Sequence, residues 1–237
     1  MNIFRKMVHG IRRVLVGKEL TSEDYVNRIR RAGGSVGERT YIFDPKSVVI
    51  DMSRPELIEI GNDVQIAHGV VMLTHGYDWS VLKGVYGEIL GSSGKVTIGN
   101  NVFIGMNTTI LKGVTVGNNV IIGACSLVNR DIPDNSVAVG NPARVVSTLE
   151  AYYEKRKAAQ YEEAAELVRT YRQQHGQDPD DAALNEFFWL FCKDPQKLCE
   201  PWDAQMHLVG NYEQSLEAFK NHTPMFESKE AFLASVK

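Results

Sequence analysis

Aliphatic residues return at every sixth position between residues 96 and 128. These positions are Ile98, Ile104, Ile110, Val116, Ile122 and Val128, and glycine follows four of them. A helix needs apolar returns at three and four residues, and a half-buried strand alternates every two, so a period of six fits neither. The period predicts a β-solenoid, in which each six-residue rung forms one side of a coil and points its aliphatic side chain to the axis.

An earlier block keeps the same spacing at Ile60, Ile66 and Met72. The step from Met72 to Ile98 is 26 residues, which six does not divide. The chain is therefore expected to leave the coil near residue 75 and to return near residue 95. Insertions in a solenoid emerge as surface loops, often on the binding side.

The segments on either side of the repeats are expected to be helical. Residues 1–32 carry an apolar face with basic residues around it, and Thr21 with Asp24 resembles a capping box. We favour packing of this face on the solenoid or on a second subunit, with membrane-surface contact as the alternative. After residue 146 we predict a long helix over 149–172, a helix over 180–191 capped by Asp178 and Pro179, and short helices over 212–219 and 229–236.

The ordered run IGNNVFIGMNTTILKGVTVGNNVIIGACSLVNRDIPDNSVAVGNPARVV, together with a histidine at the start of the excursion, resembles the hexapeptide-repeat acyltransferases. The similarity is to the galactoside, maltose and polysaccharide O-acetyltransferase branch, and covers about residues 42–146. It implies a mainly β fold, a left-handed parallel β-helix over residues 37–147 between an N-terminal helical segment (1–36) and a C-terminal α-helical extension (148–237). It also implies a homotrimer with acetyl-coenzyme A (acetyl-CoA) bound between subunits.

Composition narrows the function only slightly. The chain has 237 residues and a net charge of -3, which gives no reason to expect nucleic acid as a partner. Its three cysteines match no metal-binding spacing, and no metal is expected. No apolar run reaches the length of a membrane span, and the N-terminus lacks the pattern of a secretory signal. These features predict a cytoplasmic protein.

Transfer of an acetyl group to a hydroxyl needs a base with a pKa near neutrality, and we predict His75. His68, the other histidine of the solenoid region, is the alternative. The second imidazole nitrogen requires an acceptor, either Asp78 or a backbone carbonyl. Tyr77 and Trp79, in the same loop, are candidate contacts to the acceptor or the acyl group.

The tetrahedral oxyanion needs a hydrogen-bond donor. The family often has a small polar residue at the position of Met106, so here the donor would be the backbone N–H of Met106 or the side chain of Asn107. Phe103 stands where the family commonly has tryptophan, and is a candidate substrate contact. The aromatic cluster Phe187, Phe188, Trp189 and Phe191 is interpreted as core, with a sugar-stacking platform as the alternative.

The resemblance also implies the coenzyme A contacts. The backbone amides around Gly105, Gly123 and Ala124 would lie along the pantetheine arm, beside Asn107. Phosphates require cations, which the last coils supply as Lys112, Arg130 and Arg144. Asn129 and Arg130 stand at the place of the family's Thr-Lys pair, and Arg144 matches its arginine at the nucleotide end.

The leading hypothesis is an acetyl-CoA-dependent O-acetyltransferase that modifies a sugar or a surface-polysaccharide precursor. An N-acyltransferase acting on an amino sugar or a small xenobiotic would use the same base. A zinc enzyme of the γ-carbonic anhydrase type needs three converging histidines, whereas the coil has only two. A trimeric scaffold without catalysis is the last alternative.

Overall fold

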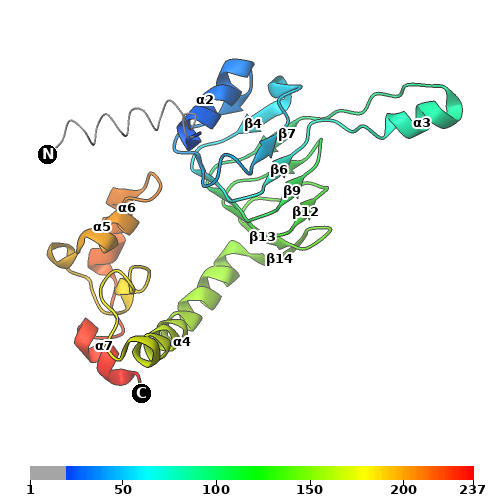
Figure 1. Ribbon diagram of the computed structural model, residues 1–237. Helices are drawn as coiled ribbons and strands as arrows, with labels where there is room; N and C mark the ends of the chain where they lie inside the picture. The colour runs from blue at the N-terminus through cyan, green and yellow to red at the C-terminus, as the bar shows by residue number, and fades with distance from the viewer. Residues whose placement is uncertain (1–19) are drawn as a thin grey trace, which may run out of the picture. The chain divides into compact units, whose positions relative to one another are not determined.

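The computed structural model describes residues 20–237 (Figure 1). They divide into two compact units, one ending at Leu149 and the other formed by Glu150–Lys237. Each unit has its own hydrophobic core. The basic amphipathic segment predicted before residue 20 lies outside the described residues. Within them, no helix combines the length and the hydropathy that a membrane span requires.

The first unit is a left-handed parallel β-helix with three sheets. The first sheet has the order β1-β4-β7-β10, with strands Ser35–Val36, Ile58–Ile60, Val96–Ile98 and Thr115–Val116. The second has the order β14-β13-β11-β8-β5-β2, with strands Arg144–Thr148, Ser136–Val139, Val120–Ile122, Val102–Ile104, Val64–Ile66 and Tyr41–Ile42. The third has the order β12-β9-β6-β3, with strands Leu127–Val128, Thr109–Ile110, Val71–Met72 and Val49–Ile50.

The repeat of the sequence is the repeat of the coil. Ile98 pairs with Val116, Ile104 with Ile122, and Ile110 with Val128, so one full coil takes eighteen residues, or three six-residue rungs. All six aliphatic side chains are at most 1% exposed. Burial of each one is worth roughly 1.5–3 kcal/mol, which explains why the period is kept so strictly. The predicted fold class is confirmed.

Helix α2 (Ser22–Ala32) packs at the start of the coil. Thr21 and Asp24 form the predicted capping box, and the helix ends at Gly33 in a left-handed conformation (φ 108°). Its buried face includes Tyr25, whose hydroxyl donates to the Val48 carbonyl (3.1 Å) and accepts from the Ile50 N–H (3.2 Å). The helix is thereby joined to the first coil. Between β3 and β4, the 3₁₀ helix η1 (Pro55–Leu57) turns the chain.

The predicted excursion is an arm that leaves and re-enters the coil at one corner. Its base is closed by an antiparallel bridge between His75 and Ser93, and by hydrogen bonds from Gly76 N to Ser92 O and from Gly94 N to Thr74 O, both 2.9 Å. The arm carries helix α3 (Trp79–Tyr86), which has no buried residue. Figure 1 shows α3 well away from the strands.

The second unit is helical. It contains α4 (Leu149–His175), η2 (Phe188–Leu190), η3 (Pro195–Lys197), α5 (Glu200–Met206), α6 (Tyr212–Asn221) and α7 (Lys229–Ser235). The predicted long helix and the two short C-terminal helices are confirmed.

The helix predicted over 180–191 is wrong. Turns and η2 occupy this segment, with bonds from Leu190 N to Phe187 O (3.0 Å) and from Phe191 N to Phe188 O (3.1 Å). Phe188, Leu190 and Phe191 are all buried, although Phe188 and Leu190 are only two residues apart and would not be neighbours on a helical face. Tighter turns direct these side chains into the core, so burial overrides the capping signal at Asp178.

Candidate active site

His75 and Asp51 form an imidazole–carboxylate pair at the base of the arm. The distance from His75 Nδ1 to Asp51 Oδ2 is 2.5 Å. The Asp51 side chain is 8% exposed and that of His75 is 32% exposed. Within residues 20–237, no hydrogen bond engages His75 Nε2. A partly exposed imidazole that is held through one nitrogen can exchange a proton through the other.

The coil brings Asp51 under His75. Strands β3 and β6 are neighbours, with Ile50 paired to Met72, and the Asp51 N–H donates to the Met72 carbonyl (2.9 Å). Asp51 therefore follows β3 where the arm begins after β6. Its Oδ2 also accepts from the Thr74 hydroxyl (2.5 Å) and the Thr74 N–H (3.2 Å). Ser53 donates to Oδ1 through its hydroxyl (2.6 Å) and its N–H (3.0 Å).

These hydrogen bonds determine the charge on Asp51. Burial raises the pKa of the Asp51 carboxyl, but the donors from Ser53, Thr74 and His75 outweigh it and hold this pKa well below its usual range. An ionised carboxylate only accepts hydrogen bonds, so Nδ1 of His75 carries the proton. The lone pair then resides on Nε2, which is the nitrogen that can act as a base.

Asp51 replaces the acceptor predicted at Asp78. Asp78 precedes α3, is exposed, and makes no side-chain cap to the helix. Its Oδ1 is close to Gly76, because a Cβ added there would lie 2.3 Å from it. Proximity in sequence suggested Asp78, but the carboxylate that meets the imidazole comes from the preceding coil. Tyr77 and Trp79 are also in the arm, with ring centroids 4.8 Å apart, and Tyr77 is 69% exposed.

Two corners of the coil differ in whether their backbone N–H groups have hydrogen-bond acceptors. Where the first sheet turns into the second, amide side chains form a ladder: Asn100 Oδ1 accepts from Asn62 N (2.8 Å), and Asn118 Oδ1 accepts from Asn100 N (2.9 Å). At the next corner, no hydrogen bond to the N–H of Met106 or Ala124 occurs within the described chain. These two N–H groups therefore have no partner within the described residues, and an acceptor on a ligand could satisfy them.

The residues at the Met106 corner stack closely. Gly105 and Gly123 occupy equivalent positions after β8 and β11, and a Cβ on Gly105 would lie 2.5 Å from Ala124 N. Met106 and Asn107 are exposed, and Asn107 has a left-handed backbone (φ 57°). Phe103, in β8, is 43% exposed. The coil thus brings together Phe103, Gly105, Met106, Asn107, Gly123 and Ala124.

The predicted cations are divided between two corners: Lys112 and Arg130 follow strands of the third sheet, whereas Arg144 pairs with Val139, which packs on Gly123 at the Met106 corner. Lys112 shares the corner with His75, since a Cβ added to Gly76 would be 3.6 Å from Lys112 Cε. Asn129 and Arg130 follow β12 one coil later and are exposed. Arg144 begins β14, is exposed, and donates through Nη1 to the Ala143 carbonyl (2.7 Å).

One chain does not place the predicted base beside the predicted oxyanion donor. Met106 precedes β9 and Lys112 follows it. The Met106 corner and the His75 corner therefore lie at opposite ends of the strands of the third sheet. Both corners are exposed on the outside of the coil. A site that uses both groups therefore requires the surface of a second subunit.

His68 has a carboxylate partner of its own. Its Nδ1 lies 2.8 Å from Asp44 Oδ2, and its side chain is 51% exposed. The hydrogen bond from His68 holds the pKa of the Asp44 carboxyl below its ordinary value, against a smaller opposing effect of burial. His68 is at the Met106 corner, where its carbonyl accepts from Asn107 N (2.9 Å). Residues 20–237 contain no cluster of three or more metal-ligating side chains.

The sequence offered one indirect signal for Asp51, but no way to align it with His75. The step between paired residues of β3 and β6 is 22 (Ile50 to Met72), whereas the regular coils step by 18. Extra residues between β3 and β4, including η1, cause the difference. Counting in sixes therefore fails where the carboxylate must be aligned with the imidazole. An aspartate directly after an aliphatic pair, Val49–Ile50, was the only available signal.

The fold and the paired side chains define a class of protein: a parallel β-helix of six-residue rungs with a candidate base at the foot of an inserted arm. Comparisons agree with this class. The family model described as "Bacterial transferase hexapeptide (six repeats)" matches residues 95–130. Protein CapG of Staphylococcus aureus is 43% identical over 142 residues, which are 58% of this chain and 77% of CapG. The chain therefore belongs to the hexapeptide-repeat acyltransferase family.

Other relatives match over a smaller share of this chain and of their own length. Galactoside O-acetyltransferase of Escherichia coli is 44% identical over 92 residues, which span 39% of this chain and 44% of that enzyme. Among solved structures, a maltose O-acetyltransferase from Clostridium difficile is 31% identical, with a TM-score of 0.38, over 53% of this chain and 75% of that one.

Proposed function

We propose that the chain is an acetyl-CoA-dependent O-acetyltransferase whose acceptor is a hydroxyl of a sugar or of a surface-polysaccharide precursor. The observation that carries the proposal is the His75–Asp51 pair at the base of the arm. Nε2 takes the hydroxyl proton as the oxygen attacks the thioester carbonyl, the new C–O bond forms, and the C–S bond breaks. The proton then passes to the departing thiolate, so no acyl-enzyme is needed.

The nature of the acceptor is inferred from the relatives. A relative that is 44% identical over the matched segment is named a galactoside O-acetyltransferase. A further relative, 32% identical over 121 residues, is named serine acetyltransferase 2 of Arabidopsis thaliana. The first name specifies O-acetylation, and the acceptor in each name carries at least one hydroxyl. We favour a sugar hydroxyl over an amine because the galactoside enzyme is named an O-acetyltransferase. We also propose the cytoplasm as the place of reaction.

The donor fits the exposed corners of the coil. Coenzyme A presents a chain of amides and a phosphate-bearing end. The uncapped N–H groups of Met106 and Ala124 supply donors to amide carbonyls at one corner. Lys112, Arg130 and Arg144 are the candidate cations for the phosphates, and Asn129 lies beside Arg130. The Met106 N–H, or the Asn107 side chain, is also suited to hold the oxyanion.

A homotrimer resolves the separation of the two corners. In a threefold assembly, the His75 corner of one subunit faces the Met106 corner of the next, and the arm lies at their junction. The arm has apolar side chains ready for such contact, because Val81, Val85 and Ile89 are each more than 60% exposed. We expect a mass in solution of three times 26.5 kDa by light scattering. A monomer at micromolar concentration would contradict this assembly.

The activity is tested with the full chain, acetyl-CoA and a panel of galactosides, maltosides, hexosamines and nucleotide sugars. We expect one acceptor class to gain an acetyl ester, with equimolar release of coenzyme A. Mass spectrometry of the product is preferable to a thiol-reactive dye, because Cys125 is an exposed free thiol. An acetyl amide instead of an ester would support N-acylation. If no acceptor is acetylated and the chain does not bind coenzyme A, the proposal is contradicted.

A further inference from the structure

The second unit contains a groove of about 870 Å³ that the acetyl-transfer reaction does not use. One wall is a single face of α4, carrying Tyr153, Arg156, Gln160 and Glu163 at helical spacing. The other includes Phe187, Trp189 and His222. The volume lies within the range of small-molecule sites, which combine aromatic walls with a few fixed polar groups.

The rings of the groove retain accessible surface. Tyr153 is 58% exposed, and Phe187 and Trp189 are only partly buried. The Trp189 ring is held by its neighbours: its centroid lies 4.8 Å from that of the His222 ring and 5.0 Å from that of the Phe219 ring. His222 is fixed in turn, because its Nε2 lies 2.9 Å from the Trp189 carbonyl. The Trp189 indole N–H donates no hydrogen bond within residues 20–237, and the ring lines both this groove and the adjoining pocket around Gln205 and Met206.

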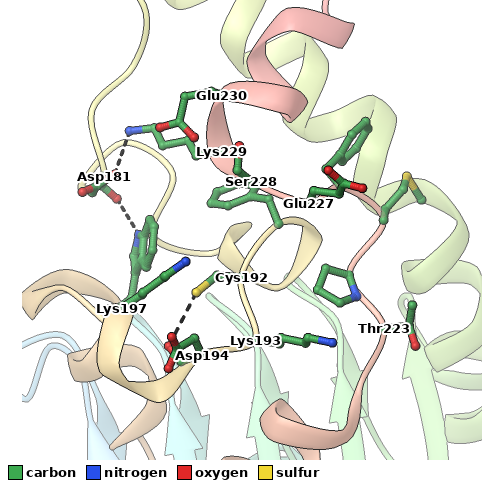
Figure 2. Close-up of a pocket in the computed structure, with 15 residues that line it drawn as sticks. Asp181, Cys192, Lys193, Asp194, Lys197, Thr223, Glu227, Ser228, Lys229 and Glu230 are labelled. Carbon is green, nitrogen blue, oxygen red and sulfur yellow. Dashed lines mark hydrogen bonds and ion pairs between the residues drawn. The ribbon is translucent and has the colours of Figure 1, made fainter.

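A neighbouring pocket shows the opposite arrangement (Figure 2). It is about 840 Å³ in volume, but its tryptophan, Trp202, is 6% exposed. The Trp202 ring stacks on Phe188, with centroids 5.4 Å apart, and its N–H donates to the Asp181 carbonyl (2.9 Å). Lys229 is paired with the Asp181 carboxylate (2.7 Å). The tryptophan of that pocket and its Asp181–Lys229 ion pair are therefore committed to the fold.

The polar groups of the groove are arranged in advance. Both nitrogens of the Arg156 fork donate to Glu163, with Nη1 2.6 Å from Oε1 and Nη2 2.5 Å from Oε2. This contact raises the pKa of Arg156 and lowers the pKa of Glu163, against a smaller opposing effect of burial in each case. Such a fork offers a ligand hydroxyl one charged donor and one charged acceptor in a fixed geometry.

The charge of the groove selects among ligands. Its charged side chains are Arg156, Lys157, Glu163 and Glu186, two of each sign, and Lys157 lies over the Tyr153 ring at 5.7 Å. A strongly anionic or cationic ligand gains nothing from this balance. A purely apolar ligand would desolvate four charges. A neutral molecule with apolar faces and many hydroxyls matches both the rings and the fork.

We propose that this groove is a second carbohydrate-binding site, which takes a neutral oligosaccharide independently of the catalytic corners. The pyranose C–H faces stack on Tyr153, Phe187 and Trp189, and ring hydroxyls bind Arg156 and Glu163. Its role is to hold the acceptor polysaccharide near the enzyme; that role rests on the proposed function, whereas the binding does not.

The test is calorimetric titration of the full chain, without acetyl-CoA, by maltotriose, cellotriose, a galactose trimer and the trimer of N-acetylglucosamine. At least one is expected to bind with a Kd of about 1 mM or tighter. Tyr153→Ala and Glu163→Gln are expected to weaken that binding at least about tenfold. Glu162→Gln removes an exposed charge from the adjacent position outside the groove, and is expected to bind as wild type does.

Two results would overturn the site: no trisaccharide binding at about 10 mM, or binding that Tyr153→Ala and Glu163→Gln leave unchanged. His75→Ala should bind the trisaccharide normally. Binding in the groove without any acetyl transfer would refute the proposed function alone. Acetyl transfer without groove binding would refute the second site alone.

Discussion

Replacing His75 by alanine is expected to reduce kcat for acetyl transfer by about 10²- to 10⁴-fold, the usual contribution of a positioned general base. The acceptor hydroxyl has a pKa far above neutrality, so attack on the thioester requires that its proton be removed in the transition state. Nε2 of His75 is available for this purpose, because Nδ1 is held by Asp51. Steady-state kinetics with a saturating acceptor measure the change.

The control for His75→Ala is coenzyme A binding, which should remain within a few-fold of wild type, because the proposed donor contacts lie on other residues. A far-ultraviolet circular dichroism spectrum should also be unchanged, since His75 is partly exposed and outside the strands. Full activity in this variant would contradict the assignment. His68→Ala would then be the next variant, because His68 is the other imidazole of the coil with a carboxylate partner.

Replacing Asp51 by asparagine is expected to reduce kcat by about 10²-fold. The carboxylate holds the proton on Nδ1 and stabilises the imidazolium that forms when Nε2 takes the acceptor proton. An uncharged amide keeps the shape but loses the charge, and its NH₂ group cannot accept from Thr74 or Ser53. Asp78→Asn is the matched control, because Asp78 is exposed in the arm, and its kcat should change less than about threefold. Equal losses in both variants would contradict a special role for Asp51.

Acid stability offers a second measurement on Asp51→Asn. The pKa of the Asp51 carboxyl is lower in the folded chain than in the unfolded chain, so its contribution is fully present above the unfolded pKa of about 4. The contribution is lost as the pH falls further towards the folded pKa. Urea unfolding should therefore show a flatter pH dependence for Asp51→Asn than for wild type below about pH 4. Identical slopes would mean that the carboxylate does not carry this hydrogen-bonded charge.

The fold was predictable because its signal is local and repeated. Each rung places one aliphatic residue in the same environment, so Ile98, Ile104 and Ile110 report the coil without any knowledge of long-range contacts. The arm was predictable for the same reason, since the spacing from Met72 to Ile98 interrupts the six-residue repeat. Helix α4 is long enough for composition alone to indicate it.

The site was only partly predictable. His75 follows from the break in the repeat, but its partner Asp51 depends on a step of 22 residues that no six-residue count contains. The separation of the His75 and Met106 corners depends on which end of the third sheet's strands each corner adjoins. The segment 180–191 was misassigned because the capping signal at Asp178 is local, whereas burial of Phe188 and Phe191 depends on the whole second unit.

The closed base of the arm has a consequence for how such enzymes diversify. Within the described residues, the base of the arm is closed by the contacts around His75 and Ser93, and the inward-facing aliphatic residues before and after it keep their alignment. Residues 77–91 can therefore change in length or composition without shifting any rung. Mutation there can alter the arm while His75 and the coil around it remain in place. The coil is a fixed frame, whereas the arm is the part whose sequence can vary, within what the proposed subunit contacts of Val81, Val85 and Ile89 allow.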